Sequence, residues 1–160
     1  MKSSTLRWSG IFPFVTAILA SCAALSAHAA HAAPPALPDP CKLVTLGELA
    51  KITGPVNGPI PDEHTDGGIY TCEYTVVSTG KWITIRLEDG SRGPVRAPGG
   101  DHASVPLPEF GKNAYLIPNS HGVAVDLYAD KHGINLSVSM PTGTSVEMVK
   151  AIARKALARL

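Results

Sequence analysis

Residues 69–88 read IYTCEYTVVSTGKWITIRLE, and two alternating patterns meet within them at a glycine. In the first half, residues 69–78, the even positions from Tyr70 to Val76 share one face of an extended chain. In the second half, residues 82–88, the apolar side chains are Ile83, Ile85 and Leu87. Alternation with period two is typical of half-buried strands, and Thr79-Gly80 suits a tight turn. This stretch therefore predicts an antiparallel hairpin with one apolar face and one polar face.

A second hairpin is expected in the C-terminal half of the chain. Residues 123–128 and 134–140 both alternate apolar with polar side chains, and residues 130–133 between them contain the turn signal His132-Gly133. Residues 115–117 and 103–107 are candidates for a short further strand and an edge strand. The sheet is thus expected to have four to five antiparallel strands.

Two helices are expected at the ends of this domain. Thr45-Leu46-Gly47-Glu48 matches a capping box that opens a short helix to Thr53, and residues 144–147 match a second box whose helix should run nearly to Leu160. Between the first helix and the first strand, residues 55–68 are rich in proline and acidic residues and predict an irregular loop. The fold class is therefore α+β, with both helices packed on one face of the sheet.

The N-terminus has the features of a secretory signal peptide. Lys2 and Arg7 precede an apolar run from Ile11 to Ala20 that is too short for a good membrane-spanning helix. Cleavage after residue 29 would leave a soluble protein, whereas the sequence before Cys22 resembles a lipoprotein box, so that residues 1–21 would be removed and Cys22 lipidated. Residues 30–38 then form an Ala/Pro-rich linker and residues 39–160 a single domain. We expect a periplasmic or secreted location in bacteria, with attachment to the membrane only through a lipid on Cys22.

Export also determines how the cysteines are interpreted. Once Cys22 is removed or lipidated, two cysteines remain, Cys41 and Cys72. In an oxidising compartment they are expected to form one structural disulfide, because the spacing is not that of a redox-active Cys-x-x-Cys pair.

The chain resembles actinobacterial envelope lipoproteins of unknown function over roughly residues 39–140. The resemblance rests on Asp39-Pro40-Cys41 before the short helix, on Cys72 with the aromatic Tyr74 two residues later, and on Val105 followed by residues 110–114 (Phe-Gly-Lys-Asn-Ala). The chain differs in having Tyr74 where those proteins usually have Trp, and Ser21 where their lipid box usually has Gly. The resemblance implies an exported, disulfide-bonded α+β domain at the cell envelope, and it supplies no catalytic residues.

Composition bears on the partners of the domain. The 160 residues contain 14 Lys and Arg and 13 Asp and Glu, and loss of Lys2 and Arg7 leaves the mature chain close to neutral. A near-neutral chain has no net charge with which to attract nucleic acid, so a nucleic-acid partner is not expected.

Sequence signals for catalysis are sparse. There is no Gly-x-Ser-x-Gly motif, and Ser120-His121 and Asp101-His102 place suitable residue types only side by side. Asp62 and Glu63 lie in the predicted loop. The candidate metal ligands are the loop histidines His64, His102, His121 and His132. Their spacing fits no common ligand pattern. We expect neither a metal nor another cofactor.

A binding surface is the better-supported expectation. Trp82, Thr84 and Arg86 on one predicted strand, and Asn135, Ser137 and Ser139 on another, combine an aromatic anchor with small polar groups. The glycine-rich segment 89–104 adds Arg92 and Arg96, whose guanidinium groups suit an anionic ligand. The sequence thus favours a non-enzymatic binding or interaction module for an envelope protein or small ligand; the alternative is a small hydrolase or metal-dependent enzyme that uses the loop histidines.

Overall fold

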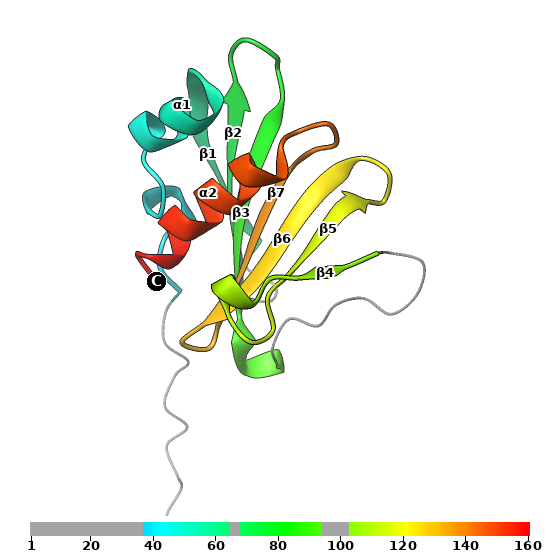
Figure 1. Ribbon diagram of the computed structural model, residues 1–160. Coiled ribbons are helices and arrows are strands. Elements are labelled where there is room, and N and C mark those ends of the chain that lie inside the picture. Colours follow the sequence, from blue (N-terminus) through cyan, green and yellow to red (C-terminus); the bar gives the residue numbers. More distant parts are fainter. Residues whose placement is uncertain (1–36, 65–67, 94–102) are drawn as a thin grey trace, which may run out of the picture. The chain divides into compact units, whose positions relative to one another are not determined.

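The computed structural model describes residues 37–64, 68–93 and 103–160, in which one antiparallel sheet carries two helices (Figure 1). The seven strands lie in the order β1-β2-β3-β7-β6-β5-β4. Their bounds are β1 Val56–His64, β2 Ile69–Val76, β3 Trp82–Asp89, β4 Val105–Pro106, β5 Tyr115–Ser120, β6 Ala124–Lys131 and β7 Ile134–Pro141. The helices are α1, Leu46–Thr53, and α2, Val146–Leu157, and three short 3-10 turns are η1 Pro40–Lys42, η3 Gly90–Arg92 and η4 Pro108–Phe110.

Both predicted hairpins are present. β2 pairs with β3 with Cys72 opposite Ile85, and β6 pairs with β7 with Leu127 opposite Val138. β3 and β7 lie side by side, with Ile85 opposite Val138, and so join the two hairpins into one sheet. The α+β class is confirmed.

The predicted strand number of four to five is too low, because residues 55–68 are not an irregular loop. Val56–His64 forms the edge strand β1, paired along β2 from Val76 to Ile69. Prolines are tolerated at sheet edges and at bulges, where a missing N–H donor costs little. Gly58 and Pro59 lie at a register shift between Asn57 and Ile60. The prolines of this segment therefore indicate an edge strand rather than a break in the sheet.

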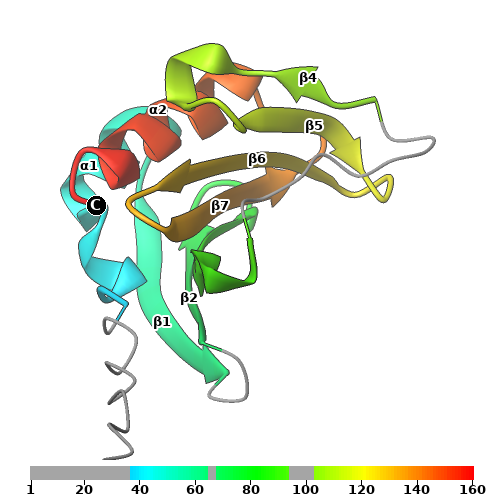
Figure 2. The same ribbon diagram turned by 90° about the horizontal axis from the view of Figure 1, so that it is seen from below.

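Both helices cover the same face of the sheet, as Figure 2 shows from a second direction. Leu49 of α1 and Val149, Ile152 and Ala153 of α2 are completely buried in one core cluster with alternate residues of the strands. From the strands, this core includes Cys72, Tyr74, Ile83, Ile85, Leu87, Leu116, Val125, Leu127, Leu136 and Val138. We call this side of the sheet the covered face.

The start of α1 agrees with the sequence, whereas the start of α2 differs by one residue. The Thr45 hydroxyl accepts a hydrogen bond from the Glu48 amide, and the Glu48 carboxylate accepts one from the Thr45 amide, which completes the predicted capping box. In α2 the cap is Ser145, whose hydroxyl accepts from the Glu147 amide at 3.3 Å. The predicted cap Thr144 is wrong, because Ser145 is the residue with extended backbone next to the first helical turn, and α2 ends at Leu157, short of Leu160.

Residues Asp39, Pro40 and Cys41, at the N-terminal end of the domain, lie on the covered face of the sheet. The Asp39 carboxylate accepts from the Cys41 amide at 2.9 Å and so caps η1. The predicted disulfide between Cys41 and Cys72 is present, with 5.2 Å between the two Cα atoms. The buried Tyr74 hydroxyl donates to the Cys41 and Val44 carbonyls, and burial, followed by the charge of Asp39, raises the pKa of Tyr74 to about 12. The segment before α1 is therefore fixed to β2 by a covalent bond and by hydrogen bonds.

The predicted signal peptide, the lipidation site Cys22 and all but the last two residues of the predicted linker lie outside the described residues. Within the described ranges, no helix has the length and apolar character needed to cross a membrane.

Candidate binding surface

The face of the sheet opposite the helices presents the polar halves of the alternating patterns. We call it the open face and define it by the outward residues of β2, β3, β7, β6 and β5. Strand pairing brings the predicted surface residues of β3 and β7 together, with Thr84 opposite Ser139 and Arg86 opposite Ser137. Trp82 is 37% exposed at the end of β3, opposite Thr75 of β2. The six predicted surface residues of these two strands thus form one continuous patch.

Arg86 is the cation of this patch. Its guanidinium lies 3.3 Å from a carboxylate oxygen of Glu88, two residues along the same strand, and both side chains are partly exposed. Such a pair between exposed side chains is weak, about 0 to 1 kcal/mol. Either side chain can therefore leave this ion pair and bind a ligand at a small cost in free energy.

A second cluster, which the sequence analysis did not single out, adjoins this patch on β5 and β6. Tyr115 lies opposite Tyr128, and their rings stack with centroids 4.9 Å apart and an interplanar angle of 22°. The Tyr128 hydroxyl donates to Oδ2 of Asp126 at 3.3 Å. Tyr128 in turn lies opposite Ser137 of β7, so the aromatic cluster continues the Arg86–Ser137 row across the sheet.

Burial and the Asp126 charge act together on these tyrosines. Each has its pKa raised to about 12, first by burial and next by the negative charge of Asp126. Both phenols therefore remain protonated and neutral at physiological pH. The alternation in residues 123–128 already indicated that Asp126 and Tyr128 share the polar side of their strand. What the sequence lacked was the pairing that sets Tyr115 beside them.

The predicted arginine loop falls mostly outside the described residues. The backbone of Arg92 ends η3, whose N-cap Asp89 accepts from the Ser91 amide at 2.8 Å. The Arg92 side chain and residues 94–102, which include Arg96 and His102, lie outside the described part of the chain. Asn135 of the open face donates to the Gly93 carbonyl at 3.2 Å, so the start of this segment lies next to β7.

The two histidines with described side chains do not come together. His121 lies in the turn between β5 and β6, and His132 lies in the turn between β6 and β7. The eight residues of β6 separate these turns by about 26 Å, so His121 and His132 cannot bind the same metal ion. Both have positive φ, 51° and 53°, a conformation that turns require. The His64 side chain is outside the described residues, and among those described no three His, Cys, Asp or Glu side chains are grouped as metal ligands would be.

Ser120 is the last residue of β5, and His121 is the first residue of the turn to β6. Ser120 is 4% exposed, whereas His121 is exposed in the turn that follows it. Asp62, predicted in a loop, is instead a residue of the edge strand β1.

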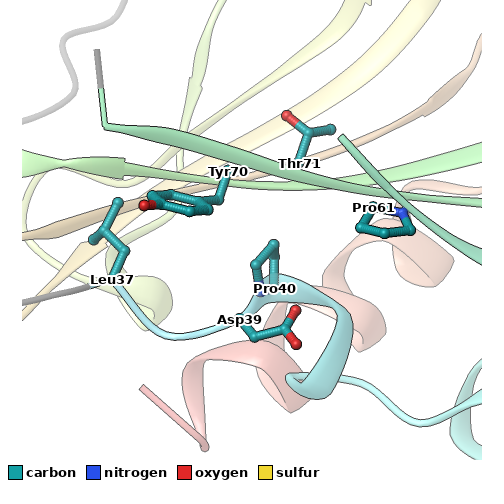
Figure 3. A pocket seen from close by; sticks show the side chains of 6 residues that line it. All are labelled: Leu37, Asp39, Pro40, Pro61, Tyr70 and Thr71. Atoms are coloured by element: carbon teal, nitrogen blue, oxygen red, sulfur yellow. The ribbon is translucent and has the colours of Figure 1, made fainter. Parts of the chain in front are cut away.

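The cavities described are small, and none is lined by an outward residue of β3 or β7. One of about 240 Å³ lies between residues 37–40, which precede α1, and the strands β1 and β2. Its lining is Leu37, Pro40, Pro61 and Tyr70, with the polar side chains of Asp39 and Thr71 (Figure 3). A wider one of about 430 Å³ lies beside the end of α2, near Phe110 and Arg154. The Arg154 guanidinium lies 5.2 Å from the centre of the Phe110 ring, a cation–π contact that ties η4 to α2. Neither cavity holds a predicted site residue.

Comparisons of the chain with protein-family models, with curated proteins and with solved structures found no match. Functional inference therefore depends on the residues themselves.

Proposed function

We propose that this chain is an exported bacterial domain of the periplasm or cell envelope that binds a partner, without catalysis, through the open face. The observation that carries the proposal is the contrast between the two faces of one sheet. The helices bury the apolar side of every central strand. The other side of β2, β3 and β7 retains a polar surface with an aromatic anchor, Trp82, at one end, whereas the outward residues Ile117 and Asp126 of β5 and β6 are buried. Half-buried polar and aromatic side chains on a rigid sheet are a common basis for protein recognition.

The alternative, a small hydrolase or metal-dependent enzyme, is less well supported. It needs histidines that converge with a carboxylate or a serine, and the two histidines with described side chains lie at opposite ends of β6. The export and location parts of the proposal rest on the N-terminal sequence, Lys2, Arg7 and the apolar run that follows.

The proposal can be tested by photo-crosslinking in the producing bacterium. The full chain is expressed with p-benzoyl-phenylalanine in place of Trp82, which is 37% exposed on the open face. The matched control carries it in place of Met148, which is 36% exposed on α2. We expect a discrete crosslinked product at least fivefold stronger from position 82. Equal products from both positions, or a product from position 148 alone, would argue against binding through the open face.

The same preparation tests the location. The intact mass of the mature protein distinguishes a chain that begins after residue 29 from one that begins at a lipidated Cys22. A product that retains residues 1–21 without modification would contradict export.

A further inference from the structure

The charges on the strands are separated between the two faces of the sheet. On the outward side of β2, β3, β7 and β6, the described side chains include four carboxylates and a single guanidinium, that of Arg86. The carboxylates are Glu73, Glu88, Asp126 and Asp130. Lysines and arginines instead accompany the helices on the covered face, among them Lys150, Arg154, Lys155 and Arg159. A chain that is nearly neutral overall therefore presents an acidic surface on its open face.

Asp126 is the most deeply placed of these carboxylates. It is only 7% exposed, on the central part of β6 opposite Ile117 and Ser139. Its Oδ2 accepts from Tyr128, but its Oδ1 is buried and has no hydrogen-bond partner. Leaving a buried carboxylate oxygen without a donor is costly, so such an atom calls for an explanation. A ligand could supply this donor if the side chains that now close the oxygen off from solvent moved aside; Oδ1 of Asp130 is buried and without a partner in the same way.

The surroundings of Asp126 suit a cation better than a neutral donor. The Asp126 carboxylate accepts a hydrogen bond from Tyr128, whose ring stacks on that of Tyr115, and aromatic rings attract positive charge. After burial, the charge of Asp126 is the second cause that raises the pKa of both tyrosines. An ammonium or guanidinium group would offset that charge.

The spread of the carboxylates distinguishes between classes of cation. Glu73 and Asp126 occupy strands that are three places apart in the sheet, with Thr84 and Ser139 between them. At about 4.8 Å per strand, their Cα atoms are separated by about 14 Å. One metal ion or one small amine cannot contact carboxylates so far apart, whereas several basic side chains of one polypeptide can.

From these observations we infer that the open face binds a segment of a partner protein that is rich in lysine or arginine, with one basic side chain received by Asp126 beside Tyr128 and others by Glu73 and Glu88. This inference rests on the proposed function and specifies the chemistry of the partner. It also gives the exposed carboxylates a role, since opposite charges steer association and fix which partners are accepted.

The test measures binding of a hexalysine peptide to the mature full-length protein by calorimetry at low ionic strength. We expect Asp126→Asn to weaken binding at least tenfold, and Glu73→Gln and Glu88→Gln to weaken it two- to fivefold each. The control is Glu147→Gln on α2, whose side chain is 72% exposed and should leave the affinity within twofold of wild type. Thermal melting checks that each variant is folded. If Asp126→Asn does not fold, the two glutamate variants still test the inference.

Several outcomes would overturn the inference. An equal loss in Glu147→Gln would mean non-specific attraction, and wild-type affinity in Glu73→Gln and Glu88→Gln would remove the acidic surface from the interaction. Binding of free lysine as tight as that of hexalysine would indicate a small amine ligand, and binding of Ca²⁺ or Zn²⁺ that Asp126→Asn abolishes would indicate a metal. If hexalysine fails to bind while position 82 still crosslinks to a partner, the inference fails and the proposed function stands.

Discussion

Alternate residues of the same strands point to the covered face and to the open face of this sheet, and the two sets have different environments. In β3, Ile85 is completely buried against the helices, while its neighbours Thr84 and Arg86 point to the other side and remain partly accessible. The covered face also contains the disulfide and the capped helix starts. The interactions that stabilise the domain are therefore concentrated on the covered face.

The two faces differ in electrostatics as well as in packing. Glu48 of α1 receives two hydrogen bonds from the Arg159 guanidinium, at 2.8 and 2.9 Å, and Lys155 lies 3.5 Å from the same carboxylate. These two basic groups near the helices thus share an acidic partner within the domain. Among the described side chains of the open face, the carboxylates outnumber the cations.

The largest expected effect contrasts two adjacent residues of β3. Ile85→Ala creates a cavity in the core and should lower the free energy of unfolding by about 2 to 5 kcal/mol. Thr84→Ala, on the open face, should lower it by no more than about 1 kcal/mol, since it loses only strand preference. Urea denaturation followed by circular dichroism measures both. Similar losses in the two variants would contradict the assignment of stability to the covered face.

Removal of the disulfide should have a slightly smaller effect. Cys41 and Cys72 are 31 residues apart, and closing a loop of that length stabilises a protein by about 3 to 4 kcal/mol in the chain-entropy description. The double variant Cys41→Ala/Cys72→Ala should therefore unfold at a much lower denaturant concentration than the oxidised protein. Reduced wild-type protein is the matched control and should behave like the double variant. If both unfold at the midpoint of the oxidised protein, the bond does not stabilise the covered face.

The smallest expected effect is a pH dependence from the ion pair between the helices. Hydrogen bonds from the Arg159 guanidinium, and then from the Thr45 amide, hold the pKa of Glu48 well below its usual value of 4.5. Folding therefore favours the ionised carboxylate. Its contribution is complete above the pKa of the unfolded chain and is lost progressively as the pH falls below about 5.

Denaturant unfolding between pH 7 and pH 3 tests this contribution. Wild-type protein should lose more stability over this range than Glu48→Gln, which has no carboxylate to protonate at this position. Arg159→Gln should flatten the profile only in part, because the Thr45 amide and Lys155 still favour the ionised Glu48 carboxylate, and the double variant should match Glu48→Gln. Equal slopes in wild type and Glu48→Gln would show that the pair makes no contribution.

Local signals predicted much of the covered face. The alternation in residues 69–88 and 134–140, the box at Thr45 and Glu48 and the two remaining cysteines each have a cause within a short stretch of chain or in the export of the protein. The prediction was wrong where local preference and sheet position disagree. The prolines of β1 look like loop residues until an edge strand gives them a place, and Thr144 matched a cap motif that Ser145 fills.

The open face was predicted less completely. Trp82, Arg86 and the serines of β7 could be assigned to polar sides of strands, but nothing in the sequence indicated that β3 and β7 are neighbours. The stacking of Tyr115 on Tyr128 and the burial of Asp126 depend on pairing between β5 and β6. The alternation in residues 123–128 predicts β6, whereas residues 115–117 are too few to show a period.

The sequence by itself determined the two hairpins, the two helices, the class of fold and the disulfide, because periodicity, capping and cysteine number are properties of short segments. Only the tertiary structure decided the strand order, the edge position of β1 and the acidic character of the open face. Strand pairing brings together residues that are far apart in the chain. Net charge is a sum over all residues and does not say where in the fold the charges lie. A nearly neutral composition can therefore fold into a domain with carboxylates gathered on one face of the sheet and a basic helix, α2, on the other.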